Sequence, residues 1–129
     1  MNPPGDGASD GAHPYRADAG ANSGRRHWRW QRASAIALVP LTLWFVTQIL
    51  NHIGDGYHAA LAWVAQPAAA AALIAYLAFA FAHSQLGLQV IFEDYIATES
   101  MRAKAVLACA AVNALGFVAA TVAVLRIAL

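Results

Sequence analysis

Charged side chains are scarce in this sequence, and long stretches have none. Only 12% of the 129 residues are Asp, Glu, Lys or Arg, whereas 60% are hydrophobic. A soluble globular domain carries about twice this share of charge, so the composition argues against a water-soluble fold. Cysteine is nearly absent too. Cys109 alone can form neither an intrachain disulfide nor a thiolate metal site, and we interpret it as a small buried apolar residue.

The uncharged stretches are long enough to cross a membrane. They lie between Arg32 and Asp55, between Asp55 and Glu93, and between Lys104 and Arg126. Each exceeds the roughly 20 residues that a helix needs to span the hydrocarbon core. Their hydrophobicity is continuous rather than alternating, which indicates helices and not barrel strands. We therefore predict an all-α integral membrane domain over residues 25–129, a three-helix anchor with spans at about 33–53, 66–92 and 103–125.

Two prolines give further information on the shape and the start of these spans. Pro40 lies inside the first span and is predicted to kink it, which membrane helices tolerate. Pro67 suits the first turn of the second span. The intervening loop extends to about Gln66, and residues 59–65 are predicted to be interfacial or to form a short re-entrant turn.

The N-terminal segment differs in composition from the rest of the chain. Residues 1–24 are rich in Gly, Pro, Ala, Asp and Asn and show no apolar periodicity, which predicts a disordered tail. Five basic residues precede the first span: Arg16, Arg25, Arg26, Arg29 and Arg32. Two more lie between the second and third spans and none between the first and second, so the N-terminus is predicted to be cytoplasmic. Since the arginines and Trp28 and Trp30 directly precede a span, we expect them to meet lipid headgroups and not nucleic acid.

Polar residues gather on one stripe at the end of the second span. At 100° per residue, His83, Gly87, Val90 and Asp94 share one face of a helix. The rise from His83 to Asp94 is about 16 Å. We therefore expect His83 near mid-membrane, and Asp94 with Tyr95 at the cytoplasmic boundary.

His83 is the candidate metal ligand. A buried imidazole in lipid is costly unless it binds a metal or is hydrogen-bonded. Haem iron takes a neutral imidazole, and Gly87, one turn along, would leave room for the macrocycle. A bis-histidine haem would need its second ligand from another polypeptide. The alternative is a cofactor-free scaffold in which His83 bonds a backbone carbonyl or a neighbouring helix. The other histidines, predicted to lie in tail or loop positions and to be solvated, are His13, His27, His52 and His58.

Asp94 and Tyr95 are the candidate quinone residues. A phenol hydroxyl can donate a hydrogen bond to a quinone carbonyl, and a nearby carboxylate can orient the phenol or relay protons. The alternative is that Glu93 and Asp94 only mark a helix end and that Tyr95 belongs to an aromatic belt at the interface.

The stretch HSQLGLQVIFEDYI, which contains these residues, resembles the second-helix signature of a known family. This family is the succinate dehydrogenase hydrophobic membrane-anchor subunit, the smaller anchor of respiratory complex II, in its alphaproteobacterial and mitochondrial form. The stretch QRASAIAL, which begins at Gln31, is similar to the start of the family's first helix. The resemblance covers about residues 28–129.

The resemblance implies a function and a set of partners. It implies a non-catalytic subunit of a complex in the bacterial inner membrane. This subunit would pair with a larger cytochrome b anchor. The two anchors would carry flavoprotein and iron–sulfur subunits, which pass electrons from succinate to ubiquinone. By position, His83 is implied as an axial ligand of haem b, Tyr95 as a hydrogen-bond donor to ubiquinone, and Asp94 as its support. Arg32 is implied close to the haem propionates and the quinone pocket. The alternative is an anchor of a quinol:fumarate reductase or of another quinone-linked membrane cytochrome b.

Overall fold

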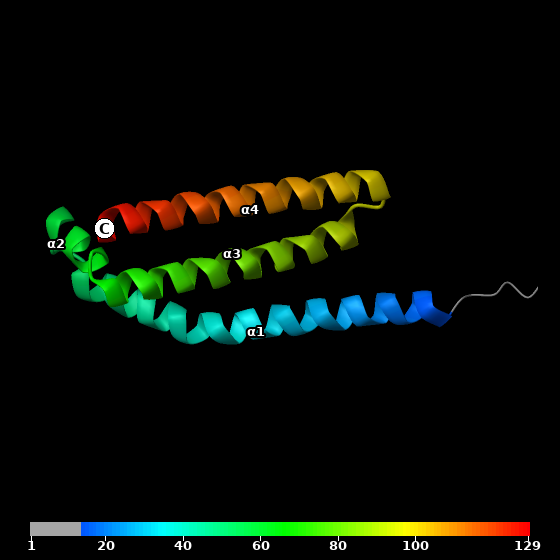
Figure 1. Cartoon of the computed structure of the whole chain (residues 1–129), viewed down its shortest axis with the longest axis horizontal. Coiled ribbons are helices and arrows are strands. Elements are labelled where there is room, and N and C mark those ends of the chain that lie inside the picture. Colours follow the sequence, from blue (N-terminus) through cyan, green and yellow to red (C-terminus); the bar gives the residue numbers. More distant parts are fainter. Residues whose placement is uncertain (1–13) are drawn as a thin grey trace, which may run out of the picture.

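The structure, a computed structural model, describes the backbone of residues 14–129 and the side chains of residues 24–129. This part of the chain forms four helices, α1 (Pro14–His52), α2 (Tyr57–Val64), α3 (Pro67–Tyr95) and α4 (Glu99–Ala128). The long helices α1, α3 and α4 are each long and apolar enough to cross a membrane. Figure 1 shows α3 between α1 and α4, with the short α2 across one end of the bundle. The predicted all-α anchor with three spans is confirmed.

The first helix begins earlier than the sequence predicted. α1 begins at Pro14, whereas the predicted disordered tail ends at residue 24. The rest of that tail, residues 1–13, lies outside the described residues. Proline is well suited to the start of a helix, because the first N–H groups have no partner within the helix. The alanines that follow favour continuation, and extending an existing helix costs much less than nucleating one.

The connection between the first two spans contains a short helix, α2, in the stretch that the sequence predicted to be a loop whose second part is interfacial or a short re-entrant turn. Gly54 and Gly56 have positive φ angles of 97° and 82°, which glycine adopts without steric cost, and they reverse the chain before α2. Trp63 of α2 then packs against α1, with its ring centroid 6.2 Å from Trp44 and 5.3 Å from His52. These aromatic contacts hold α2 against the bundle at the end opposite the α3–α4 turn (Figure 1).

Aromatic rings and a glycine join α3 to its two neighbours. Phe45 of α1 stacks on Tyr76 of α3 at 4.9 Å with an interplanar angle of 15°. On the other side of α3, Phe81 packs edge-on against Phe117 and lies over Gly116 of α4. α1 remains one helix through Pro40, and its second half curves toward the start of α3 (Figure 1).

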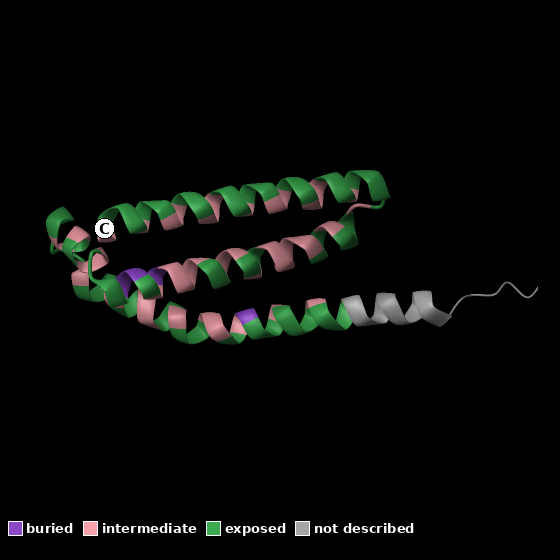
Figure 2. Ribbon diagram, in the orientation of Figure 1, coloured by how far each residue is buried: buried purple, intermediate pink, exposed green. Residues whose placement is uncertain are grey.

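Few side chains are buried within this chain. Among the described residues only Ala69, Ala70 and Leu73 of α3 and Ser34 of α1 are buried (Figure 2). Cys109 is half-buried, less enclosed than predicted, and Asn113 donates a hydrogen bond to its carbonyl at 3.0 Å. So much exposed apolar surface would be untenable in water but is the normal state of helices that face lipid or partner helices.

Candidate functional site

His83 lies on the face of α3 that meets α1. Its imidazole is half-buried, and its Nδ1 atom is 3.0 Å from the hydroxyl oxygen of Ser34. Ser34 is only 3% exposed and is the one buried polar residue among the described side chains. The helices α1 and α3 run antiparallel (Figure 1), so this pair sets the register between them.

The register places His83 closer to the start of the first span than the sequence predicted. Ser34 follows Arg32 by two residues, which is about 3 Å along the helix axis. His83 therefore lies close to the level of Arg32, where the apolar part of α1 begins, and not midway along that apolar part. Hydropathy alone places each span separately and does not fix how far one helix is shifted against another.

An apolar groove opens beside His83. Its volume is about 380 Å³, and besides His83 it is lined by Ala35, Leu38, Val39, Thr42 and Leu43 of α1. The lining side chains are small or aliphatic except for Thr42 and the imidazole. A flat apolar macrocycle with one imidazole ligand fits this chemistry. Among the described residues no group of three or more His, Cys, Asp or Glu could hold a bare metal ion, whereas haem needs only one ligand from this chain.

Arg32 precedes the groove residues on α1 and is not one of the groove's lining residues. Positions 32, 35 and 39 follow helical spacing, so Arg32 shares a stripe of α1 with Ala35 and Val39 of the groove wall. Its side chain is exposed, and its guanidinium carbon lies 4.8 Å from the ring centroid of Trp28. This cation–π contact restrains the guanidinium beside Trp28.

Gly87 faces α1 one turn beyond His83. A Cβ atom built at Gly87 would lie 3.6 Å from Nε2 of Gln31, which is an ordinary contact, and nothing else comes within 4 Å. Gln31 also has its Oε1 atom buried without a hydrogen-bond partner among the described residues, as has Nε2 of His27. His27, Gln31 and Ser34 therefore form a polar stripe on the face of α1 that meets α3.

The structure corrects the prediction that the other histidines lie in tail or loop positions. His27 is half-buried within α1, because the helix begins ten residues before the predicted end of the tail. His52 is also half-buried, and its Nδ1 atom lies 2.8 Å from the carbonyl of Gln48. His58 is exposed, but in α2 and not in a loop, while His13 lies outside the described residues.

Asp94 and Tyr95 lie apart from His83 at the end of α3. Asp94 shares the His83 stripe but is exposed, and Tyr95 is 84% exposed. Eleven residues, about 16 Å, separate Asp94 from His83. Neither side chain makes a hydrogen bond or ion pair within the described chain, whereas the Glu93 side chain accepts a hydrogen bond from Gln89 at 2.8 Å. The fold thus brings His83 against Ser34 and Gly87 against Gln31, and it leaves Asp94 and Tyr95 on open surface.

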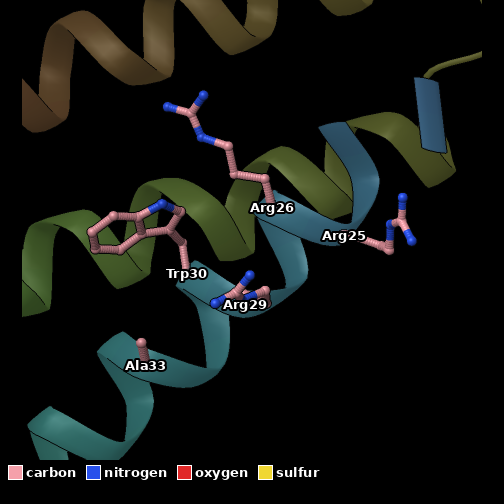
Figure 3. Close-up of a pocket in the computed structure, with 5 residues that line it drawn as sticks. All are labelled: Arg25, Arg26, Arg29, Trp30 and Ala33. Carbon is pink, nitrogen blue, oxygen red and sulfur yellow. The ribbon is translucent and has the colours of Figure 1, made fainter. Parts of the chain in front are cut away.

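Arginines and tryptophan surround the start of the first span. Arg25, Arg26, Arg29, Trp30 and Ala33 line a hollow of about 680 Å³. Figure 3 shows the three arginine side chains spreading out from α1, with Arg26 and Trp30 on one side of the helix. Cations beside an indole suit the anionic headgroup layer of a membrane.

Sequence reasoning missed the part that Ser34 plays. It treated this serine only as one letter of the QRASAIAL stretch. The available signal was a hydroxyl that follows Gln31 by one helical turn at the start of an otherwise apolar run. That spacing predicts a polar stripe, but only the tertiary structure shows that it meets His83.

Comparisons with known proteins agree on one family. The sequence model for the succinate dehydrogenase/fumarate reductase transmembrane subunit matches residues 13–123. The chain is 32% identical to the succinate dehydrogenase hydrophobic membrane anchor subunit of Rickettsia bellii, over 81% of this chain and 83% of that protein. It is 28% identical to the subunit of the same name from Rickettsia felis, over 63% of this chain and 68% of that protein. No solved structure shows a significant match.

Proposed function

This chain belongs to the succinate dehydrogenase/fumarate reductase transmembrane subunit family, and from that premise we propose how it serves the complex. It is a multi-pass membrane-anchor subunit of succinate dehydrogenase that associates with the other subunits and with the membrane, and a bacterial inner membrane fits its Rickettsia relatives. In our proposal it pairs with a larger cytochrome b anchor. Together the two anchors hold the iron–sulfur and flavoprotein subunits at the cytoplasmic face, so that electrons from succinate reach ubiquinone.

The first part of the proposal is that His83 is an axial ligand of haem b. The observation that carries it is a half-buried imidazole beside an apolar groove of about 380 Å³ in an uncharged membrane segment. The haem would supply a one-electron redox centre, and the larger anchor would supply the second ligand. His83 would hold the iron, while Ala35 and Val39 would exclude water from one side of the macrocycle.

Arg32 and Gly87 complete this half of the haem site. Arg32 lies at the end of the groove stripe, and its planar guanidinium suits a bidentate contact with a propionate carboxylate. Gly87 follows His83 by one turn, and only the end of the Gln31 side chain comes within 4 Å of a Cβ built there, so we assign Gly87 the clearance that the macrocycle needs. In this proposal His83 would hold the iron, Gly87 would leave clearance, and Arg32 would bind a propionate carboxylate.

The second part concerns the quinone. We assign Tyr95 as the donor of a hydrogen bond to a ubiquinone carbonyl and Asp94 as the carboxylate that orients the phenol or relays protons. Both side chains are exposed at the end of α3, so partner subunits must cover them to form a pocket. α3 ends toward the end of the bundle at which α1 begins (Figure 1), and the Arg and Trp residues of α1 precede its apolar part, which supports a site at the cytoplasmic boundary.

Two measurements test the proposal. Purification of the tagged chain in mild detergent should bring down flavin- and iron-containing subunits, and their absence would remove the partner assignments. In the purified complex, His83→Ala should abolish the reduced-minus-oxidised haem spectrum. His58→Ala is the matched control, because His58 is exposed in α2 and should leave the spectrum intact. An unchanged spectrum in His83→Ala refutes the ligand assignment.

A second candidate function is the anchor of a quinol:fumarate reductase. The matching family includes transmembrane subunits of both enzymes, and the reverse reaction can use the same residues. Rates of succinate oxidation with ubiquinone and of fumarate reduction with a low-potential quinol, measured on one preparation, decide between the two. Faster fumarate reduction would favour this second candidate.

A further inference from the structure

The hydroxyl of Ser34 takes part in two hydrogen bonds but has only one proton. Its oxygen lies 3.0 Å from the backbone carbonyl of Gln31 and 3.0 Å from Nδ1 of His83. A carbonyl oxygen can only accept, so the bond to Gln31 uses the hydroxyl proton. The hydroxyl oxygen is then left as an acceptor toward His83.

This assignment determines the tautomer of His83. When the Ser34 oxygen accepts, Nδ1 of His83 must carry the proton and donate it. A neutral imidazole has a single N–H, so Nε2 keeps its lone pair. The only hydrogen bond of the His83 side chain in the described chain uses Nδ1, and the ring lines the apolar groove. The nitrogen that is free to bind iron is therefore Nε2.

From this geometry we infer that Ser34 is a positioning residue that holds His83 in the Nδ1–H tautomer, with Nε2 presented to haem iron. The inference rests on the proposed role of His83 as haem ligand. Ser34 touches neither the iron nor the quinone and acts only through the imidazole. Its burial matters, because at 3% exposure water has little access to replace the hydroxyl as acceptor.

The hydrogen bond also has an electronic consequence. One nitrogen of a ligating imidazole binds the metal, and the other can donate its N–H to an acceptor. Such an acceptor raises the basicity of the imidazole and fixes its ring orientation. A more basic ligand stabilises ferric over ferrous iron. The Ser34 contact is therefore expected to tighten haem binding and to lower the reduction potential of the haem. Losing such a partner typically weakens metal affinity by about 10- to 100-fold.

The test uses the assembled complex purified in detergent. Ser34→Ala removes the acceptor, and Ser34→Thr keeps a hydroxyl. Two quantities are measured, the haem content per complex and the midpoint potential from an optical redox titration. We expect Ser34→Ala to bind haem about 10- to 100-fold more weakly, so that the complex loses haem on dilution. We also expect the midpoint potential of the haem to become more positive. Ser34→Thr should stay close to wild type in both.

A matched control separates the imidazole contact from the bond within the helix. Thr47 also donates its hydroxyl proton to a carbonyl of its own helix, that of Leu43 at 2.7 Å, but it is exposed and has no hydrogen bond to a histidine in the described chain. Thr47→Val should therefore leave haem content and midpoint unchanged. If Ser34→Ala does not assemble, Ser34→Cys, which has nearly the same shape but is a weak acceptor, should shift both quantities in the same direction by a smaller amount.

The outcomes distinguish this inference from the proposed function. Wild-type values in Ser34→Ala, or equal shifts in Ser34→Thr or Thr47→Val, overturn the role of Ser34 while leaving His83 as ligand. A haem spectrum that survives in His83→Ala instead removes the ligand itself.

Discussion

A methyl group at Gly116 is expected to weaken the packing of α4 against α3. A Cβ atom at this position would lie 2.8 Å from Cε1 and 3.1 Å from Cζ of Phe81. Carbon atoms in ordinary contact are about 3.5–4.0 Å apart, so the Phe81 ring would have to move by roughly 0.7 Å. Phe117 packs against that ring at 6.2 Å and restricts the movement.

The expected magnitude follows from two opposing effects. Overpacking of this kind typically costs about 1–3 kcal/mol. Alanine in place of glycine within a helix gains about 1 kcal/mol. The net loss of unfolding free energy in Gly116→Ala should therefore be about 0–2 kcal/mol. Gly24→Ala is the matched control, because nothing lies within 4 Å of a Cβ there, and it should show the gain alone. The difference between the two variants isolates the steric cost.

Equilibrium unfolding in mixed micelles, followed by helical circular dichroism, measures these free energies. A double-mutant cycle with Phe81→Leu identifies the contact, since a smaller and more flexible side chain should relieve most of the cost of Gly116→Ala. If Gly116→Ala is as stable as Gly24→Ala, or if its cost is the same with Leu at position 81, the close approach of α3 and α4 described above is refuted.

Three further substitutions test other positions of α3 and of its neighbour α1. Gly87→Ala should change the unfolding free energy of the bundle by less than about 0.5 kcal/mol, because its Cβ would meet only Gln31 at 3.6 Å. The same variant should lower the haem content of the complex. A loss of stability with normal haem content contradicts this prediction. Tyr95→Phe should lower quinone reductase activity and preserve dye-linked succinate oxidation, whereas equal loss of both activities would undermine the quinone role. Phe45→Leu should lower the unfolding free energy by about 0.5–1.5 kcal/mol more than the change in buried area accounts for, because the stack on Tyr76 at 4.9 Å is lost. If Phe45→Leu lowers the unfolding free energy equally in a Tyr76→Leu background, the two rings do not interact.

The sequence singled out His83 as a candidate ligand but not the residue that lies against it, Ser34. His83 was identifiable because an imidazole in an uncharged segment needs a partner, and the HSQLGLQVIFEDYI stretch resembled a known family. Its contact with Ser34 spans 49 positions of the chain and depends on how α1 and α3 are shifted against each other. Nothing in the hydropathy of either helix encodes that shift.

The sequence by itself determined that the protein is all-α and crosses the membrane three times, because a backbone in lipid must satisfy its own hydrogen bonds and uncharged runs of sufficient length leave only helices. Only the tertiary structure decided that α1 begins at Pro14, that α2 forms, and that Ser34 meets His83 while Gly116 meets Phe81. Those features depend on the fit of side chains between helices, which in lipid is decided by close packing and interhelical hydrogen bonds and not by hydrophobicity.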